Sequence, residues 1–434
     1  MPEHVRIGAG AGFADDRIEP AVDLVERGEL DFLVFECLAE RTIALRQLER
    51  RRDPAAGFDP LLRDRMVAVL AGCRARGVRI VTNAGAANPH GAAAVIAEVA
   101  RAASLSLRIG VVLGDDVLDL LDAPDRDATA ISANAYLGSE GIVEALDDGA
   151  DVVVTGRVAD AALFAAPLVH AHGWAMDDWE HLAAALAVGH LLECAGQVTG
   201  GYFADPGVND VAGLADLGFP FADVGADGHV EISKIAGTGG VVNVRTCTEQ
   251  LLYEVHDPAR YLTPDAVVDF SRVVFTEIGE SRVMLDGAGA GPPPATLKVS
   301  VGSLAGFVGE GEISYAGPGC VARADLALEI LEKRLRDAGL DAEQFRFERI
   351  GVDAIRRGAN APVPHDLPEV RVRVAGRVRT EADAERIGRE VTGLWLNGPA
   401  GGGGARRSVT EEIAIHSTTV PRALVSARVE WVEV

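Results

Sequence analysis

VRIVTNAG, residues 78–85, is a short β-branched run that ends in asparagine and glycine. Four further runs have the same character and are separated by helix-like segments: VRIGAG (5–10), FLVFE (32–36), LRIGVVLG (107–114) and DVVVTG (151–156). Strands that alternate with helices typically build a parallel sheet. The sequence therefore predicts an N-terminal α/β domain whose mostly parallel sheet carries helices on both faces.

The residues that directly follow these runs are candidate site residues, because open α/β sheets bind ligands beyond the carboxyl ends of their strands. The set comprises Gly10, Gly12, Asp15, Asp16, Arg17, Glu36, Cys37, Glu40, Arg41, Asn83, Gly85, Asn88, Thr155, Gly156, Arg157 and Asp160.

A second domain is expected after the stretch DGAGAGPPP at 286–294, since clustered glycine and proline mark boundaries. This gives an N-terminal domain over 1–285 and a C-terminal lobe over 295–434. The lobe is predicted to run strand (296–315, or a hairpin), helix (321–338), strand (345–354), strand (370–374), helix (381–396) and strand (409–415). That βαββαβ order is typical of a ferredoxin-like α+β lobe. Within the first domain we expect one long helix over 179–198 and an extended stretch over 229–245.

Composition excludes several classes of protein. The 434 residues include 41 basic and 65 acidic side chains, a net charge of -24, which argues against binding to nucleic acid or an anionic membrane surface. No apolar run is long enough to span a bilayer, so we expect a cytoplasmic protein. The five cysteines form no C-x-x-C pair, which signals neither a zinc site nor a disulfide framework, and no other metal motif appears.

The glycines of the opening segment, Gly8-Ala-Gly-Ala-Gly12, follow a strand as they do in dinucleotide-binding proteins. The spacing fails, because Phe13 or Asp15 stands where the third glycine of that fingerprint belongs. A tight turn after the strand is therefore favoured over an NAD site. A P-loop is excluded, because no G-x-x-x-x-G-K-[ST] occurs.

The predicted helix over 179–198 carries an unusual polar stripe. His190, Glu193 and Gln197 share one face of a segment otherwise rich in alanine and leucine. Buried acids with a raised pKa serve as general acids or bases near neutral pH. The alternative is a satisfied hydrogen-bond network that ties the helix to the sheet.

Lys234, one of three lysines, precedes the turn Gly237-Thr238-Gly239-Gly240. Backbone N–H groups and an ammonium can together hold a phosphate or carboxylate. A glycine hairpin with a solvent-facing lysine is the simpler interpretation. The loop at 401–404 and the two arginines at 406 and 407 also allow two interpretations, a flexible anion-binding flap or only a loop.

Nine stretches, in this order, resemble the AtuA family of acyclic terpene utilisation. They are GAGAGFADDRIEPAVDLVERGELDFLVFECLAERTIAL (8–45), VTNAGAANP (81–89), SANAYLG (132–138), GADVVVTGRVAD (149–160), GHLLECAGQVTGGYFADPG (189–207), GTGG (237–240), EQLLYEVHDPARYLTPD (249–265), GEGEISYAG (309–317) and NGPAGGGG (397–404). The resemblance implies bacterial breakdown of acyclic terpenes through CoA thioesters. It also implies a small ferredoxin-fold partner subunit, because relatives carry such a domain or are accompanied by one. It transfers no catalytic residue.

We therefore expect a hydratase, dehydratase or lyase step on a branched acyl-CoA or carboxylate. Acid/base roles are assigned to Glu36, His190 and Glu193. Ligand-binding roles fall to Gly10, Gly12, Arg17, Asn83, Asn134, Arg157, Tyr202, Lys234, Gly237, Thr238, Gly239 and Gly240. No cofactor or metal is predicted beyond the CoA thioester as substrate, and a homo-oligomer is expected. The alternatives are a non-catalytic acyl-CoA-binding or scaffold subunit, and a nucleotide-dependent enzyme that uses the N-terminal glycines.

Overall fold

The computed structural model describes residues 2–122, 125–126, 128–340, 345–355 and 367–434. The chain forms two compact units: unit 1 comprises Met1–Gly302 and Ile415–Val434, and unit 2 comprises Ser303–Ala414. This division differs from the boundary expected near 286–294. That stretch lies inside unit 1, because β12 (Arg282–Asp286) and β13 (Gly289–Gly291) pair there with other strands of the unit.

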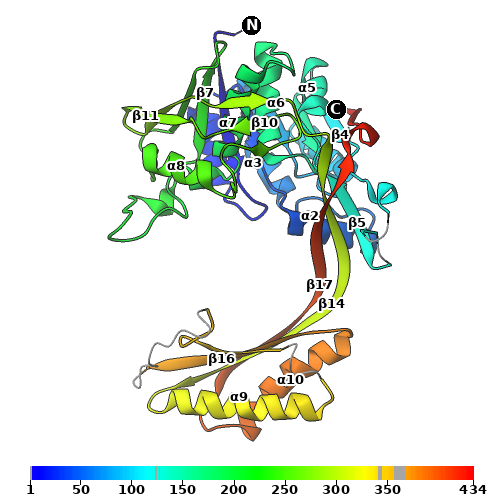
Figure 1. The fold of residues 1–434 in the computed structure, drawn as a ribbon, viewed down its shortest axis with the longest axis vertical. Coiled ribbons are helices and arrows are strands. Elements are labelled where there is room, and N and C mark those ends of the chain that lie inside the picture. Colours follow the sequence, from blue (N-terminus) through cyan, green and yellow to red (C-terminus); the bar gives the residue numbers. More distant parts are fainter. Residues whose placement is uncertain (1, 123–124, 127, 341–344, 356–366) are drawn as a thin grey trace. The chain divides into compact units, whose positions relative to one another are not determined.

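Ten strands of the described residues form the main sheet of unit 1, in the order β11-β12-β8-β7-β1-β2-β3-β6-β4-β18. Figure 1 labels β11, β7 and β4 of this sheet. Its five central strands are parallel: β1 (His4–Ala11), β2 (Phe32–Phe35), β3 (Arg79–Thr82), β6 (Val152–Thr155) and β4 (Arg108–Leu113). Strands β2 and β6 are buried along their whole length. Burial on both faces explains why these runs are continuously apolar in the sequence.

The sheet as a whole is mixed, so the prediction of a mostly parallel sheet is wrong. Four antiparallel strands extend it beyond β1: β7 (Pro220–Gly225), β8 (Val230–Lys234), β12 and β11 (Val274–Gly279). At the other edge β18 (Arg428–Glu433) pairs antiparallel with β4. Strands β7 and β8 are joined by a turn in which Gly228 N donates to Gly225 O at 3.0 Å. Such a short connection permits only antiparallel pairing.

Helices cover both faces of the parallel strands, as expected. One layer contains α1 (Glu19–Arg27), α3 (Leu62–Arg76) and α4 (Pro89–Ala102), and the other contains α5 (Glu140–Asp147), α6 (Asp160–His172) and α7 (Trp179–Leu192). The chain steps one way along the sheet from β1 to β4 and then back to β6. Right-handed crossovers therefore place the two groups of helices on opposite faces.

Two expected elements of unit 1 are shorter than predicted. Helix α7 ends at Leu192, and a 3-10 turn over Ala195–Gln197 follows, because Ala195 takes a positive φ of 41°. The stretch over 229–245 is extended only in β8. Helix α8 (Val244–Leu252) begins at its end, where Asn243 and Thr246 form a capping box.

The remaining elements of unit 1 surround the carboxyl edge of the sheet. They are α2 (Glu40–Arg52), β5 (Ala130–Ala135) and a small sheet of β9 (Tyr261–Leu262), β10 (Val267–Asp269) and β13. In the part of the chain that the structure describes, no helix is long and apolar enough to cross a membrane.

Unit 2 is entered along β14 (Thr296–Ala316) and left along β17 (Gly403–Pro421). Between them come α9 (Cys320–Asp337), β15 (Phe345–Ile350), β16 (Glu369–Val378) and α10 (Glu381–Asn397). The sheet order is β15-β16-β14-β17, and α9 and α10 pack on β16. Strand β14 is one long strand and not a hairpin. The core of the unit is separate from that of unit 1 and includes Ile313, Val372, Leu331 and Val391.

Candidate functional site

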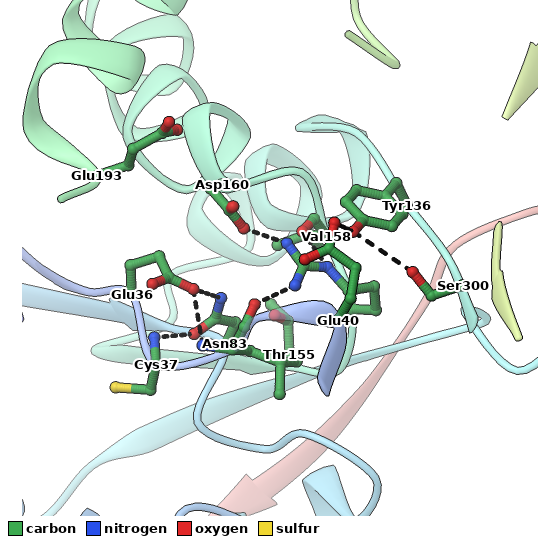
Figure 2. Close-up of polar contacts among 12 residues, drawn as sticks. Glu36, Cys37, Glu40, Asn83, Tyr136, Thr155, Val158, Asp160, Glu193 and Ser300 are labelled. Carbon is green, nitrogen blue, oxygen red and sulfur yellow. Dashed lines mark hydrogen bonds and ion pairs between the residues drawn. The ribbon is translucent and has the colours of Figure 1, made fainter. Parts of the chain in front are cut away.

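Glu36 follows β2 and lies at the carboxyl edge of the parallel strands. It is 7% exposed, and its Oε1 accepts hydrogen bonds from Leu38 N at 2.7 Å and from Asn83 Nδ2 at 2.9 Å. Asn83 follows β3, and its Oδ1 accepts from Cys37 N at 2.7 Å, so two neighbouring strand ends are joined (Figure 2). Burial raises the pKa of Glu36 to about 7, although Arg157, Asn83 and Leu38 oppose the shift.

Arg157 follows β6 and is completely buried. Its guanidinium donates to the Leu38 and Val158 carbonyl oxygens, pairs with Asp160 and lies 4.3 Å from the centre of the Tyr136 ring. A buried guanidinium needs such partners, because an unpaired charge would be very costly to desolvate. Arg157 therefore organises the surrounding side chains and does not reach the neighbouring cavity.

That cavity, which we call the acid pocket, has a volume of about 280 Å³. Its wall carries Asp160 at the start of α6, His190 and Glu193 at the end of α7, and Glu40, Glu254 and Lys298. The predicted stripe of α7 thus opens partly into a cavity. His190 Nδ1 lies 2.9 Å from Glu193 Oε1, and its Nε2 lies 3.1 Å from the Leu251 carbonyl oxygen.

Glu193 has one carboxylate oxygen without a protein partner among the described residues. That oxygen, Oε2, is buried. Burial disfavours the charged form of His190, but the adjacent Glu193 carboxylate outweighs this and raises the pKa of His190. The pair therefore holds a proton close to the pocket.

Asp160 is the third titratable group on this wall. Its side chain is 36% exposed, toward the pocket, while the rest of it is surrounded by protein. Burial raises the pKa of Asp160 well above its ordinary value against the opposing effect of Arg157, and the charges of Glu36 and Glu193 raise it further. Figure 2 shows these three acids projecting from three different elements.

The opposite wall of the pocket is fixed by an ion pair. Lys298 Nζ lies 2.8 Å from Glu40 Oε1, and the Tyr136 hydroxyl donates to the same oxygen at 2.5 Å. Burial alone would raise the pKa of Glu40, but these two donors lower it to about 2. Glu40 is therefore an anion at neutral pH, and its charge balances that of Lys298.

Asn134 lies outside the acid pocket. Its Nδ2 donates at 2.8 Å to Asp115, which also accepts from Arg157 N at 2.9 Å. Burial raises the pKa of Asp115 to about 6. Asn134 and Asp115 line a separate hollow with Gln47 and Arg50.

The N-terminal candidates have a different neighbourhood. Gly10 and Gly12 lie in and just after β1, where an added Cβ would meet the Phe35 ring and the Cys194 backbone respectively. These glycines therefore allow close packing. Gly12, Arg17 and Tyr202 line a second hollow, outside the wall of the acid pocket.

Lys234 and the glycine turn also lie apart from the pocket wall. Lys234 Nζ donates to the Thr238 carbonyl oxygen at 2.8 Å, so its ammonium caps its own turn. Gly237 and Gly240 have φ values of 81° and 86°, and a Cβ on Gly239 would collide with the Gly213 carbonyl oxygen. These contacts match a structural turn. The hairpin and the solvent-facing lysine of the simpler interpretation are wrong, because Lys234 is buried and the turn leads from β8 into α8.

Comparison with known proteins adds one finding. The family described as acyclic terpene utilisation family protein AtuA matches residues 5–431. The chain belongs to the AtuA family. The prediction from the sequence is thereby confirmed, and the family implies a role in acyclic terpene utilisation. Neither the search of curated proteins nor the search of solved structures found a match.

In this AtuA-family chain, several pocket residues escaped the sequence analysis. From the sequence we selected residues that directly follow the predicted parallel strands. This selection therefore missed Tyr136, Tyr261 and Lys298, which follow none of these strands. Asp160 and Glu40 were among the residues selected because they follow predicted strands, but no role was assigned to them. An acid three residues after Arg157, beyond the end of a predicted strand, could have singled out Asp160. Among the described residues, no group of three or more His, Cys, Asp or Glu side chains could hold a metal ion.

Proposed function

We propose that this AtuA-family protein catalyses a hydration, dehydration or lyase step on a branched acyl group, and that the acid pocket is its active site. One observation carries the proposal: the hydrogen-bonded His190–Glu193 pair and the Asp160 carboxyl, groups that can accept and donate protons, line the same small cavity. General acid–base chemistry at carbon needs such a pair of groups.

In the dehydration direction, a free carboxylate oxygen removes a proton from the carbon next to the acyl carbonyl. Glu193 fits this role, because the residue lines the pocket and no described residue donates a hydrogen bond to its Oε2. This oxygen is buried, so the role requires the Glu193 carboxylate to turn toward the pocket. The C–O bond to the hydroxyl then breaks, and the hydroxyl leaves as water with a proton from Asp160, a role that the raised pKa of this acid favours. Lys298 is the cation available to the developing enolate oxygen.

The charges of the pocket favour a thioester over a free carboxylate. Four acids line the wall, whereas the cations there are Lys298, already paired with Glu40, and the imidazole of His190. A carboxylate substrate would enter against this excess of negative charge. A neutral acyl thioester group would not meet this repulsion. The cavity is also at the lower limit of small-molecule pockets, about 300 Å³, so it suits the acyl end and not the whole CoA ester.

Proton exchange with solvent tests the proposal without knowledge of the natural substrate. Branched 3-hydroxyacyl-CoA and 2-enoyl-CoA esters are incubated with the protein in D₂O, and mass spectrometry follows deuterium at carbon 2 and the gain or loss of water. We expect both in the wild type, and a loss of about 10²–10⁴-fold in E193Q and D160N. E180Q, an exposed acid in α7, is the control and should behave as wild type.

Binding of an acyl-CoA with no deuterium incorporation would instead favour the alternative, a non-catalytic acyl-CoA-binding or scaffold subunit. Equal rates in wild type, E193Q and D160N would remove the acid pocket as the site.

We also infer that unit 2 is a ferredoxin-like lobe. Support comes from its βαββαβ order and from the antiparallel pairing of β16 with both β14 and β15. A homo-oligomer and a small ferredoxin-fold partner subunit remain proposals that native mass spectrometry of the purified protein would test.

A further inference from the structure

The second hollow of unit 1 is lined by large apolar side chains. We call it the Tyr202 groove and define it by Phe13, Tyr202, Leu214, Leu217, Phe219 and Tyr253. Its volume is about 360 Å³. Phe13, Tyr202 and Leu214 are 56%, 86% and 44% exposed. Exposed apolar residues gathered in one hollow, and not scattered singly, mark a binding surface.

The exposed Tyr202 ring is held in place by the backbone. Tyr202 has a φ of 62°, a left-handed conformation that non-glycine residues rarely adopt. The loop before it is fixed by the hydrogen bond from Gly201 N to Gly196 O, at 2.9 Å. The Tyr202 and Tyr253 rings meet edge to face with centroids 6.3 Å apart. The groove is thus preformed, with an aromatic ring kept in solvent at the expense of backbone strain.

A polar atom in the groove also lacks a partner. Gln197 Nε2 is buried, lines the groove and has no hydrogen-bond partner among the described residues. A buried amide donor of this kind is normally satisfied. Because this nitrogen is buried, it can donate to an oxygen atom of a ligand only if the Gln197 side chain turns toward the groove.

The linings of the groove and the acid pocket contain consecutive residues at two places. Glu193 lines the pocket and Cys194 lines the groove, and in the same way Glu254 lines the pocket and Tyr253 the groove. At both places the two linings are adjacent along the backbone. A ligand with its acyl end in the pocket and its chain in the groove would contact both residues of each pair.

We propose that the Tyr202 groove binds the hydrocarbon chain of the ligand whose acyl end occupies the acid pocket. The assignment of the acyl end rests on the proposed function, whereas the binding of a chain in the groove does not. The groove then acts as the specificity determinant for chain length. Its partner is a neutral, flexible hydrocarbon, because the lining offers mainly aromatic and aliphatic surface. The charged groups of the lining have partners within the protein: Asp16 accepts from Gly12 N at 2.9 Å, and Arg17 donates to the Ala215 carbonyl oxygen at 3.0 Å.

Cys194 provides a built-in reporter. It lines the groove, and the other four cysteines are buried. Burial raises the pKa of Cys194, so alkylation by N-ethylmaleimide is slow and is best followed by intact mass at about pH 8.5. C194S identifies the labelled residue. Decanol serves as the long-chain probe and butanol as the short one.

We expect decanol at ten times its dissociation constant to slow labelling of the wild type about tenfold, with little effect of butanol at the same concentration. The double variant F13S/Y202S should lose this protection. Both side chains are exposed, so the fold should tolerate the change, and a circular dichroism spectrum verifies it. L396S, which changes an exposed apolar residue of unit 2, is the matched control and should keep the protection.

Absence of protection by decanol, or equal protection in wild type and F13S/Y202S, would overturn the proposal. If F13S/Y202S instead halves the mass measured by light scattering while decanol has no effect, the groove is an interface between copies and the proposal fails. The probe is an alcohol and no turnover is measured, so the result stands apart from the deuterium-exchange test of the acid pocket.

Discussion

At the scale of single residues, Glu36 combines burial with hydrogen bonds that do not require its charge. Leu38 N and Asn83 Nδ2 both donate to Oε1, and a glutamine oxygen can accept from both. The charge is therefore a cost to the folded state. Burial raises the folded pKa from 4.5 to about 7, so the folded protein binds a proton that the unfolded chain releases at lower pH.

The sign of the effect follows directly. The stability contributed by this proton is complete below pH 4.5 and is lost as the pH rises through about 7. We expect E36Q to gain roughly 3 kcal/mol in free energy of unfolding relative to wild type between pH 4.5 and pH 8. Urea unfolding at the two pH values measures it, with E180Q as the control. A difference between E36Q and wild type that does not change with pH would contradict the assignment.

At the scale of elements, the contact of α6 with α7 holds Asp160 and the His190–Glu193 pair on one pocket wall. Gly189 permits it: a Cβ there would lie 2.3 Å from the Ala161 carbonyl oxygen. Alanine favours helix by about 1 kcal/mol over glycine, but overpacking against backbone costs about 1–3 kcal/mol. We expect G189A to lower the melting temperature and to weaken ligand binding in the acid pocket.

Gly393 in α10 provides the opposite case. An added Cβ there meets nothing within 4 Å, so helix propensity alone should make G393A neutral or slightly stabilising. Thermal unfolding followed by circular dichroism compares the two variants. A G189A protein as stable as wild type would show that the two helices can separate.

The same scale shows what sequence could predict. The β-branched runs identified the five parallel strands, and the strand-end rule selected Glu36, Asn83 and Arg157, which do meet. Periodicity could not foresee the positive φ of Ala195 that ends the polar stripe. Nor could it predict the ion pair between Lys298 and Glu40, because these residues are 258 positions apart in the sequence. The sequence suggested a ligand-binding role for Lys234. The hydrogen bond from its ammonium to its own turn, which accounts for its position, is visible only in the folded structure.

At the scale of the whole molecule, the two units have separate hydrophobic cores. All residues that line the acid pocket and the Tyr202 groove belong to unit 1. We expect a variant in which a short Gly/Ser linker replaces 303–414 to keep a folded unit 1 and its decanol-protected Cys194. Hydrogen exchange of the amides in the parallel strands measures this. Loss of their protection would mean that unit 1 depends on unit 2.

The antiparallel strand β18 has a consequence for synthesis. It covers the edge of β4 with residues 428–433, which leave the ribosome more than 300 residues after β4 itself. During that interval the nascent chain presents an open, apolar β-edge, the kind of surface that pairs with other chains. Translation speed and holding chaperones should therefore govern the yield of this protein in a foreign host, and late ribosomal pausing should favour aggregation.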